Sequence, residues 1–253
     1  MKDGRSAQSI LKGAILTAFP LAFEIKHLFS RYLCGLILFM KFDYGVAGRY
    51  RKSVEDAFDT ILDKGNEFHR FLAGQILASD MLVRVRRVSE INASGVTGLI
   101  NSGRTNNRIE DERLSLREAL GEVFIAIAEE TIDTGGQRGC EGTFVHEGRH
   151  AYDFAQTIES FSNADVNPLS VFDPTLYELE WEAHKTSGDY MLQIHLGEYI
   201  DEGLQLMILG RRDDGVCFVN NEGIKCRLRD NYGLALEGNQ GRLASELLGL
   251  QQK

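Results

Sequence analysis

The stretch His146-Glu147-Gly148-Arg149-His150 has the form H-E-x-x-H and carries the residue types of a hydrolytic metal site. Residues four positions apart lie on one face of a helix, so the two imidazoles can point at a single metal ion. In zinc hydrolases this spacing supplies two ligands, and the glutamate between them deprotonates a metal-activated water. The sequence therefore predicts Zn2+ as the cofactor, with His146 and His150 as ligands and Glu147 as general base.

A helix through this stretch has two different sides. The side of the histidines also carries Thr143, Asp153 and Thr157, while an apolar stripe is formed by Phe144, Gly148, Ala151, Ala155 and Ile158. One side can therefore pack against other elements while the other holds a metal ion. The alternative is a surface helix with two solvated histidines and an incidental glutamate.

A catalytic zinc site needs a third protein ligand and leaves its fourth position to water. Downstream, the dipeptide Asp173-Pro174 is a start signal for a second helix, expected over residues 175–194. Glu180 lies there in a largely apolar stripe, where a buried carboxylate needs a partner, whereas Glu182 lies on a charged face. We therefore expect Glu180 to be the third ligand, with Glu182 as the alternative. Further downstream candidates are Glu178, His184 and His195.

Glu180-Trp181-Glu182-Ala183-His184, which begins 30 residues after His150, completes a pattern that resembles the gluzincin branch of zinc metallopeptidases. The resemblance implies a zincin-like fold, with His146, His150 and Glu180 as ligands and Glu147 as base and later proton shuttle. It also implies a peptide or protein substrate bound along an edge strand beside the H-E-x-x-H helix. We expect that strand at residues 123–128.

The chain departs from the common gluzincin pattern at His184, where an aspartate usually steadies a ligand histidine. His184 and Asp153 are candidates for that orienting role, through a hydrogen bond to a ligand. A peptidase also needs a donor that stabilises the developing oxyanion. For this role the sequence offers His195, Tyr190 and Tyr232, each of which can equally be an ordinary surface or core residue.

The elements around the motif predict an α+β fold that is helix-rich, with a small mixed sheet beside the H-E-x-x-H helix. We expect a helical N-terminal region over residues 1–80 and the zincin-like metallopeptidase domain, with a C-terminal helix, over residues 81–253. Helices are expected from Ser53 and over residues 67–78, and a strand within residues 81–91. Residues 92–107 have the composition of turns around a short apolar piece, and Gly135-Gly136 should break the chain before the motif.

Residues 123–128 are apolar throughout and fit a buried strand or a helix; we favour the strand, after a short helix. Cys217 and Cys226 flank Asn220-Asn221-Glu222-Gly223, which could turn a hairpin and bring the two thiols together in an oxidising compartment. We favour the alternative, two reduced strand cysteines.

The net charge of −9 argues against a nucleic-acid partner recognised through bulk electrostatics. Apolar runs at residues 13–23 and 32–40 are shorter than the roughly 20 residues of a membrane-spanning helix, so no transmembrane segment is expected. A cytoplasmic location is favoured, with secretion or delivery as an effector left open, as is the oligomeric state.

Two other functions compete with a peptidase. The same scaffold could be a catalytically silent metal-binding module with a regulatory or structural role, although metal binding alone does not require Glu147. The chain could also be a helical interaction protein in which H-E-x-x-H is accidental. Metal content separates this last hypothesis from the other two.

Overall fold

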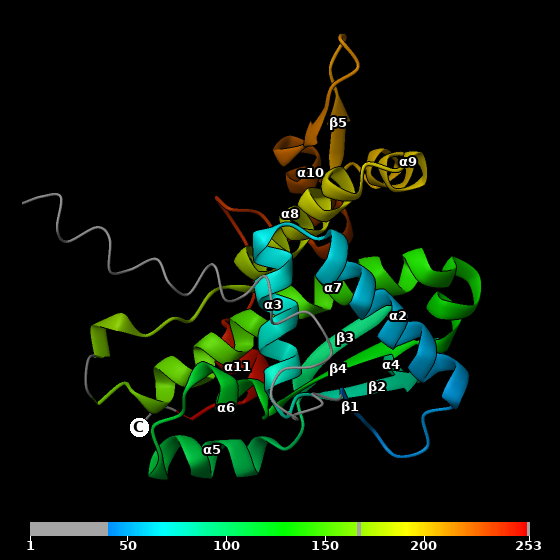
Figure 1. The fold of residues 1–253 in the computed structure, drawn as a ribbon. Helices are drawn as coiled ribbons and strands as arrows, with labels where there is room; N and C mark the ends of the chain where they lie inside the picture. The colour runs from blue at the N-terminus through cyan, green and yellow to red at the C-terminus, as the bar shows by residue number, and fades with distance from the viewer. Residues whose placement is uncertain (1–39, 166–167, 252–253) are drawn as a thin grey trace, which may run out of the picture. The chain divides into compact units, whose positions relative to one another are not determined.

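Helix α7 (Glu129–Ser162), which contains the H-E-x-x-H stretch, packs on a four-stranded mixed sheet (Figure 1). The computed structural model describes residues 40–165 and 168–251, which belong to a compact unit beginning at Met40. Of the helical region expected over residues 1–80, residues 1–39 lie outside the described part. The remainder holds β1 (Lys41–Phe42), α2 (Gly48–Lys64) and α3 (Glu67–Ala78).

The sheet has the strand order β1-β2-β4-β3, with β2 (Leu82–Arg86), β3 (Gly95–Leu99) and β4 (Val123–Ala128). Strand β2 runs parallel to β1 and β4, and β3 runs antiparallel to β4. Alternate residues of β2 are buried, as a strand with one covered face requires, whereas β4 is buried along nearly its whole length. This confirms the helix-rich α+β class with a small mixed sheet.

Strand order corrects one prediction about this sheet. Residues 123–128 do form a strand, but β4 lies between β2 and β3, so its backbone groups are already paired on both sides. Among the described residues β3 is the edge strand next to α7. The prediction failed because β3 is short and half-buried, and its Gly- and Ser-rich surroundings resemble a turn region.

Helices connect and cover these strands. The short helices α4 (Val88–Ile91), α5 (Ser102–Asp111) and α6 (Leu116–Leu120) lie between the strands in sequence, and α2 and α3 pack against α7. Gly148 of α7 faces α3, where an added Cβ would already touch Leu72 at 3.4 Å. The small residues on the apolar stripe of α7 therefore permit close helix packing. Gly136, at φ 56° and ψ −147°, interrupts the helical backbone before the motif, as expected from Gly135-Gly136.

The second half of the unit begins with the 3-10 turn Pro168–Ser170 and continues with α8 (Leu176–Ile194), which packs against α7. It then contains α9 (Gly197–Gln205), the hairpin of β5 (Leu209–Arg211) and β6 (Cys217–Val219), α10 (Asn221–Tyr232) and α11 (Ala244–Leu248). The C-terminal helix is thus present, and it closes the core through Leu248, which is 6% exposed. Among the described residues, no helix is both long enough and apolar enough to cross a membrane.

Two helix starts differ from expectation. Thr175 caps α8 in a capping box with Glu178, while the Asp173 carboxylate instead accepts hydrogen bonds from the backbone and hydroxyl of Ser245 in α11. Asp173, which the local sequence predicts as the N-cap of α8, thus makes a tertiary contact instead. Helix α2 begins at Gly48 rather than near Ser53.

The hairpin considered between Cys217 and Cys226 does not form, and of the two favoured strand cysteines only Cys217 lies on a strand. The chain turns between β5 and β6, before it reaches Cys217. Between the two cysteines, Asn220 instead caps α10 by accepting a hydrogen bond from the backbone of Gly223. Cys226 therefore lies on a helix, and both cysteines are free thiols. Asn-rich stretches serve as helix caps as readily as turns, which explains the difference.

Candidate metal centre

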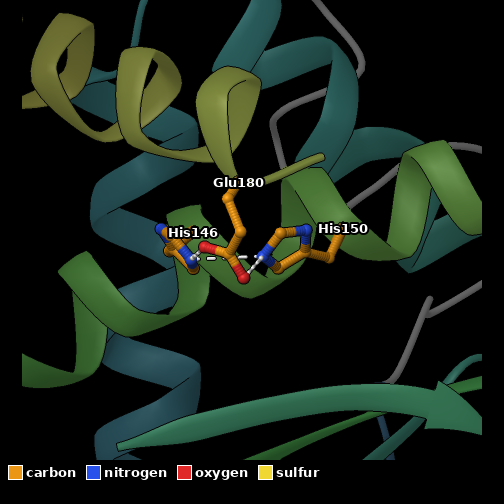
Figure 2. Close-up of side chains that lie close together, drawn as sticks. All are labelled: His146, His150 and Glu180. Atoms are coloured by element: carbon orange, nitrogen blue, oxygen red, sulfur yellow. Dashed lines mark hydrogen bonds and ion pairs between the residues drawn. The ribbon is translucent and has the colours of Figure 1, made fainter. Parts of the chain in front are cut away.

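His146, His150 and Glu180 converge from two successive α-helices of the chain (Figure 2). The histidines project from α7, and the Glu180 carboxylate projects from α8 between the two imidazoles. The two Nε2 atoms lie 3.2 Å apart. Glu180 Oε2 lies 3.5 Å from His146 Nε2, and Glu180 Oε1 lies 3.6 Å from His150 Nε2.

These distances fit a shared metal ion. A tetrahedral ion bound at about 2.0–2.1 Å sets its ligand atoms about 3.3–3.4 Å apart. The two Nε2 atoms are close to that separation, and so is each Nε2 atom from the nearer oxygen of Glu180. Within the described residues, Glu180 Oε2 is buried and has no hydrogen-bond partner, nor does His150 Nδ1. Two nitrogens and one carboxylate oxygen are also the donor types that zinc takes in hydrolytic sites.

The surroundings of His150 and Glu180 favour the protonation states that a metal site needs. Burial lowers the pKa of His150 to about 4, so this imidazole is neutral at pH 7. Burial alone would raise the pKa of Glu180, but its contact with His146 and the nearby histidine charges outweigh burial and lower it to about 2. Ligands bind metal as neutral imidazole and as carboxylate, which are the forms present here.

His146 differs from His150. Burial acts to lower its pKa, but Glu180 and Glu147 outweigh burial and raise it. Without a metal ion, these carboxylates therefore favour a proton on His146. A metal ion and this proton would compete for the same nitrogen, so metal binding should weaken as pH falls.

Glu147 lies beside the cluster on the side of strand β3. Its side chain is buried, and its Oε2 accepts a hydrogen bond of 2.7 Å from the hydroxyl of Thr97. Burial raises the pKa of Glu147, while the charge of His146 and the Thr97 hydrogen bond oppose that rise. A carboxylate with a raised pKa in a buried site has the properties of a general base or acid.

Glu180 and Glu182 have different surroundings, although they are two residues apart. The Glu180 side chain is 13% exposed and faces the histidines, whereas that of Glu182 is 36% exposed. Glu182 accepts from Lys185 at 3.1 Å and from Arg149 at 3.4 Å. The structure thus brings Glu180, and not Glu182, to the two histidines.

His184 also lies at the cluster, one helical turn after Glu180. Its Nε2 is 4.0 Å from Glu180 Oε2, and its ring centroid is 4.9 Å from that of His146. In the part of the chain that the structure describes, neither ring nitrogen has a hydrogen-bond partner. His184 therefore does not make the hydrogen bond to a ligand histidine that an aspartate would make. Burial lowers its pKa to about 3.

The structure does not bring the other sequence candidates to the ligands, with one exception. Asp153 is held by Arg149, whose Nε donates to both carboxylate oxygens at 2.9 and 3.1 Å. The Tyr190 hydroxyl is buried and donates to Glu141 at 2.7 Å. His195 is an exposed residue that ends α8, about 22 Å along the helix from Glu180 at a rise of roughly 1.5 Å per residue.

The exception is Tyr232, at the end of α10. Its ring centroid lies 6.2 Å from that of His184. Burial, followed by the negative charge of Glu180, raises the pKa of Tyr232 to about 12, so its hydroxyl remains a hydrogen-bond donor at neutral pH. Of the three oxyanion candidates, the structure places only this one beside the cluster.

A cleft of about 710 Å³ opens beside the cluster. Residues 95–102, which include all of β3, form one wall, and Glu147, His150 and Glu180 lie in its lining. The rest of the lining is apolar: Phe154, Leu176, Leu179, Leu247 and Leu248. An extended chain could therefore lie along β3 with its backbone next to the carboxylates and its side chains against apolar surface.

Sequence reasoning missed Thr97, the residue that holds Glu147. Thr97 is 50 positions from Glu147 in the chain and belongs to a segment expected to form turns. No local pattern identifies such a contact, because it depends on strand order and register.

Comparisons with protein-family models, with curated proteins and with solved structures found no match. Function must therefore be inferred from the geometry and chemistry of the side chains.

Proposed function

We propose that this chain is a zinc-dependent peptidase of the gluzincin type, with a zincin-like fold, that hydrolyses peptide bonds in peptide or protein substrates. One observation carries the proposal: His146, His150 and Glu180 converge at metal-ligand separations beside a cleft that also exposes the carboxylate of Glu147. Nitrogen and oxygen ligands supplied by two helices, with a buried carboxylate adjacent, meet the needs of hydrolysis rather than those of metal storage.

The residues divide the chemistry between them. His146, His150 and Glu180 would hold a zinc ion, which would act as a Lewis acid and lower the pKa of bound water toward neutrality. Glu147 accepts the proton of the attacking water and later delivers it to the leaving amine. Its side chain is buried and lies in the lining of the cleft.

Charge also develops on the oxygen of the attacked carbonyl. The hydroxyl of Tyr232 is a donor next to the cluster, and its raised pKa keeps the proton on the oxygen at neutral pH. A donor placed where negative charge develops lowers the barrier more than it stabilises the bound substrate. Tyr232 is therefore assigned to oxyanion stabilisation.

Substrate binding is assigned to the edge of β3 that pairs with no other strand among the described residues. The strand forms a wall of the cleft over consecutive residues, and its other edge is paired with β4. An extended peptide adds to such an edge through backbone hydrogen bonds, largely independent of its sequence. The apolar lining opposite β3 favours substrates with an apolar side chain near the cleaved bond.

A catalytically silent metal-binding module is the second candidate, and His184 is the observation in its favour. This buried imidazole lies 4.0 Å from Glu180 Oε2 with both nitrogens unpaired among the described residues. If it moved to bind the metal ion, four protein ligands would leave no position for water, as in structural zinc sites. Its nitrogen is farther from Glu180 than either ligand histidine, which favours the peptidase.

Comparing Glu147→Gln with wild type tests the proposal. Both zinc-loaded proteins are incubated with a mixed peptide library, and new termini are counted by mass spectrometry. A peptidase loses at least about 100-fold in cleavage rate in the variant. Glu159→Gln, on the same helix but outside the cleft lining, should cleave like wild type. Equal, slow cleavage by wild type and Glu147→Gln would reject the peptidase.

Zinc affinity separates the silent module further. If His184 is a fourth ligand, His184→Ala should weaken zinc binding as strongly as His150→Ala does. If the site has three protein ligands, His184→Ala should weaken binding by no more than roughly the 10- to 100-fold typical of residues that only surround a metal site.

A further inference from the structure

We infer that Thr97 is a positioning residue for Glu147, and that strand β3 is therefore part of the catalytic machinery as well as a wall of the cleft. The inference rests on the proposed function, because it gives Glu147 the role of general base. It assigns to Thr97 the task of holding one oxygen of the carboxylate so that the other is presented to the reacting water.

The contact between the two residues is specific. The Thr97 hydroxyl lies 2.7 Å from Glu147 Oε2 and 3.1 Å from the backbone oxygen of the same residue. Thr97 is paired with Ile125 of the buried strand β4, so its backbone position is fixed by the sheet. The hydroxyl of Thr97 thus contacts both the side chain and the backbone oxygen of Glu147 from a paired strand.

Gly95 makes this contact possible from the same face of the strand. Residues two apart on a strand point to one side, so Gly95 and Thr97 both face α7. A Cβ on Gly95 would lie 2.5 Å from Thr143 Cγ2, 2.7 Å from Glu147 Cγ and 3.1 Å from Glu147 Oε1. No real Cβ tolerates the first two distances, so only glycine lets the strand approach the carboxylate this closely.

The two contacts restrict Glu147 in different ways. The hydroxyl fixes Oε2 by a hydrogen bond, while the bare backbone of Gly95 leaves room beside Oε1. A glutamate has several side-chain torsions, and a free one would sample orientations that cannot reach the water. Proton transfer requires hydrogen-bond reach, and a misplacement of about 1 Å can cost roughly 100-fold in rate.

Two substitutions of Thr97 separate the hydroxyl from the shape of the side chain. Thr97→Val keeps the volume and removes the donor, whereas Thr97→Ser keeps the donor. Thr105→Val is a matched control, because the Thr105 hydroxyl also donates to a buried glutamate, Glu122, and to a backbone oxygen, both at 3.0 Å. Thr105 does not line the cleft.

The zinc-loaded proteins are compared by zinc content, kcat and KM on a peptide that wild type cleaves. Thr97→Val should keep one zinc per chain and an unchanged KM but lose roughly 10- to 100-fold in kcat. Thr97→Ser and Thr105→Val should stay within about threefold of wild type. In a Glu147→Gln background, Thr97→Val should cause no further loss, because the two residues act through one another.

Wild-type kcat in Thr97→Val, or an equal loss of kcat in the Glu147→Gln background, would overturn the inference. Crystal structures of zinc-loaded wild type, Thr97→Val and Thr97→Ser supply a readout independent of activity. The Glu147 carboxylate should move only in Thr97→Val; an unmoved carboxylate there overturns the inference. If wild type cleaves no peptide, the peptidase proposal fails, and the carboxylate position still decides whether Thr97 holds Glu147.

Discussion

At the residue scale, the cluster holds one ionised carboxylate among imidazoles whose pKa values are pushed in opposite directions. Burial lowers the pKa of His150 and His184, while Glu180 and Glu147 overcome burial and raise that of His146. Such a cluster is costly without a cation, because Glu180 Oε2 and the His184 nitrogens are buried without hydrogen-bond partners in the described chain. A bound metal ion would satisfy the carboxylate and remove the need for the proton on His146.

Glu180 and Glu182 provide a matched pair for testing the ligand set. Glu180→Gln removes the charge that faces the two histidines, so zinc measured by elemental analysis should fall well below one equivalent. Glu182→Gln removes a charge that pairs with Lys185 and Arg149 at the surface and should leave zinc unchanged. A full equivalent of zinc in Glu180→Gln would exclude the assigned third ligand.

Tyr232 and Tyr190 provide a second pair, in which the same change has different effects. Tyr232→Phe should lower kcat by roughly 10- to 100-fold with little effect on stability, because it removes an oxyanion donor from a partly exposed residue. Tyr190→Phe should instead destabilise the fold by about 1–3 kcal/mol, because it removes a hydrogen bond to the buried Glu141. Steady-state kinetics and urea unfolding of both variants check this, and an unchanged kcat in Tyr232→Phe would contradict the oxyanion assignment.

At the element scale, α7 and α8 carry the ligands, α3 is hydrogen-bonded to α8, and β3 is hydrogen-bonded to Glu147. His69 of α3 links to α8: its Nδ1 accepts from the backbone of Asn66 at 3.2 Å, so its Nε2 donates to the Thr186 carbonyl oxygen at 3.0 Å. This pattern requires a neutral ring, and burial lowers the pKa of His69 below its usual 6.5. Protonation would break the bond to Asn66 at the start of α3.

The pH dependence of stability follows from this lowered pKa. The unfolded chain takes up a proton on His69 as pH falls through 6.5, before the folded chain does, so stability is present above pH 6.5 and is lost below it. Urea unfolding in the presence of a chelator should therefore show a smaller loss of stability between about pH 7.5 and about pH 5.5 in His69→Gln than in wild type. Identical losses would mean that His69 is not held neutral by the fold.

Local patterns predict the elements that carry the ligands. Four-residue spacing places His146 and His150 on one helix face, and the apolar neighbours of Glu180 along its helix distinguish it from Glu182. Helix α3 and strand β4 also lie at their predicted positions. These features depend on periodicity, which a sequence displays directly.

The predictions that were wrong or missing concern contacts between distant segments of the chain. Strand order made β3, rather than β4, the edge beside α7, and register brought Thr97 to Glu147. Asp173 resembles a helix cap but binds Ser245, which is 72 positions away. Local propensity is overridden in such places by tertiary contacts, and no spacing rule anticipates them.

At the scale of the whole molecule, the metal ion would join two helices whose ligands are separated by 30 positions between His150 and Glu180. A ligand that binds only the folded chain stabilises it by about 2.7 kcal/mol at roughly 100 times its Kd. For a domain of this size that corresponds to roughly 5–10 °C in Tm. Thermal unfolding with zinc and with a chelator should show this difference in wild type and not in His146→Ala; an equal Tm in wild type would argue against a site that spans α7 and α8.

The cleavage of a peptide in water enriched in oxygen-18 tests the central claim most directly. Zinc-loaded wild type should produce new carboxyl termini that carry oxygen-18, and Glu147→Gln with the same zinc content should produce them at least about 100-fold more slowly. Labelled termini that appear at equal rates in both proteins, or that do not appear in wild type at one zinc per chain, would contradict the account.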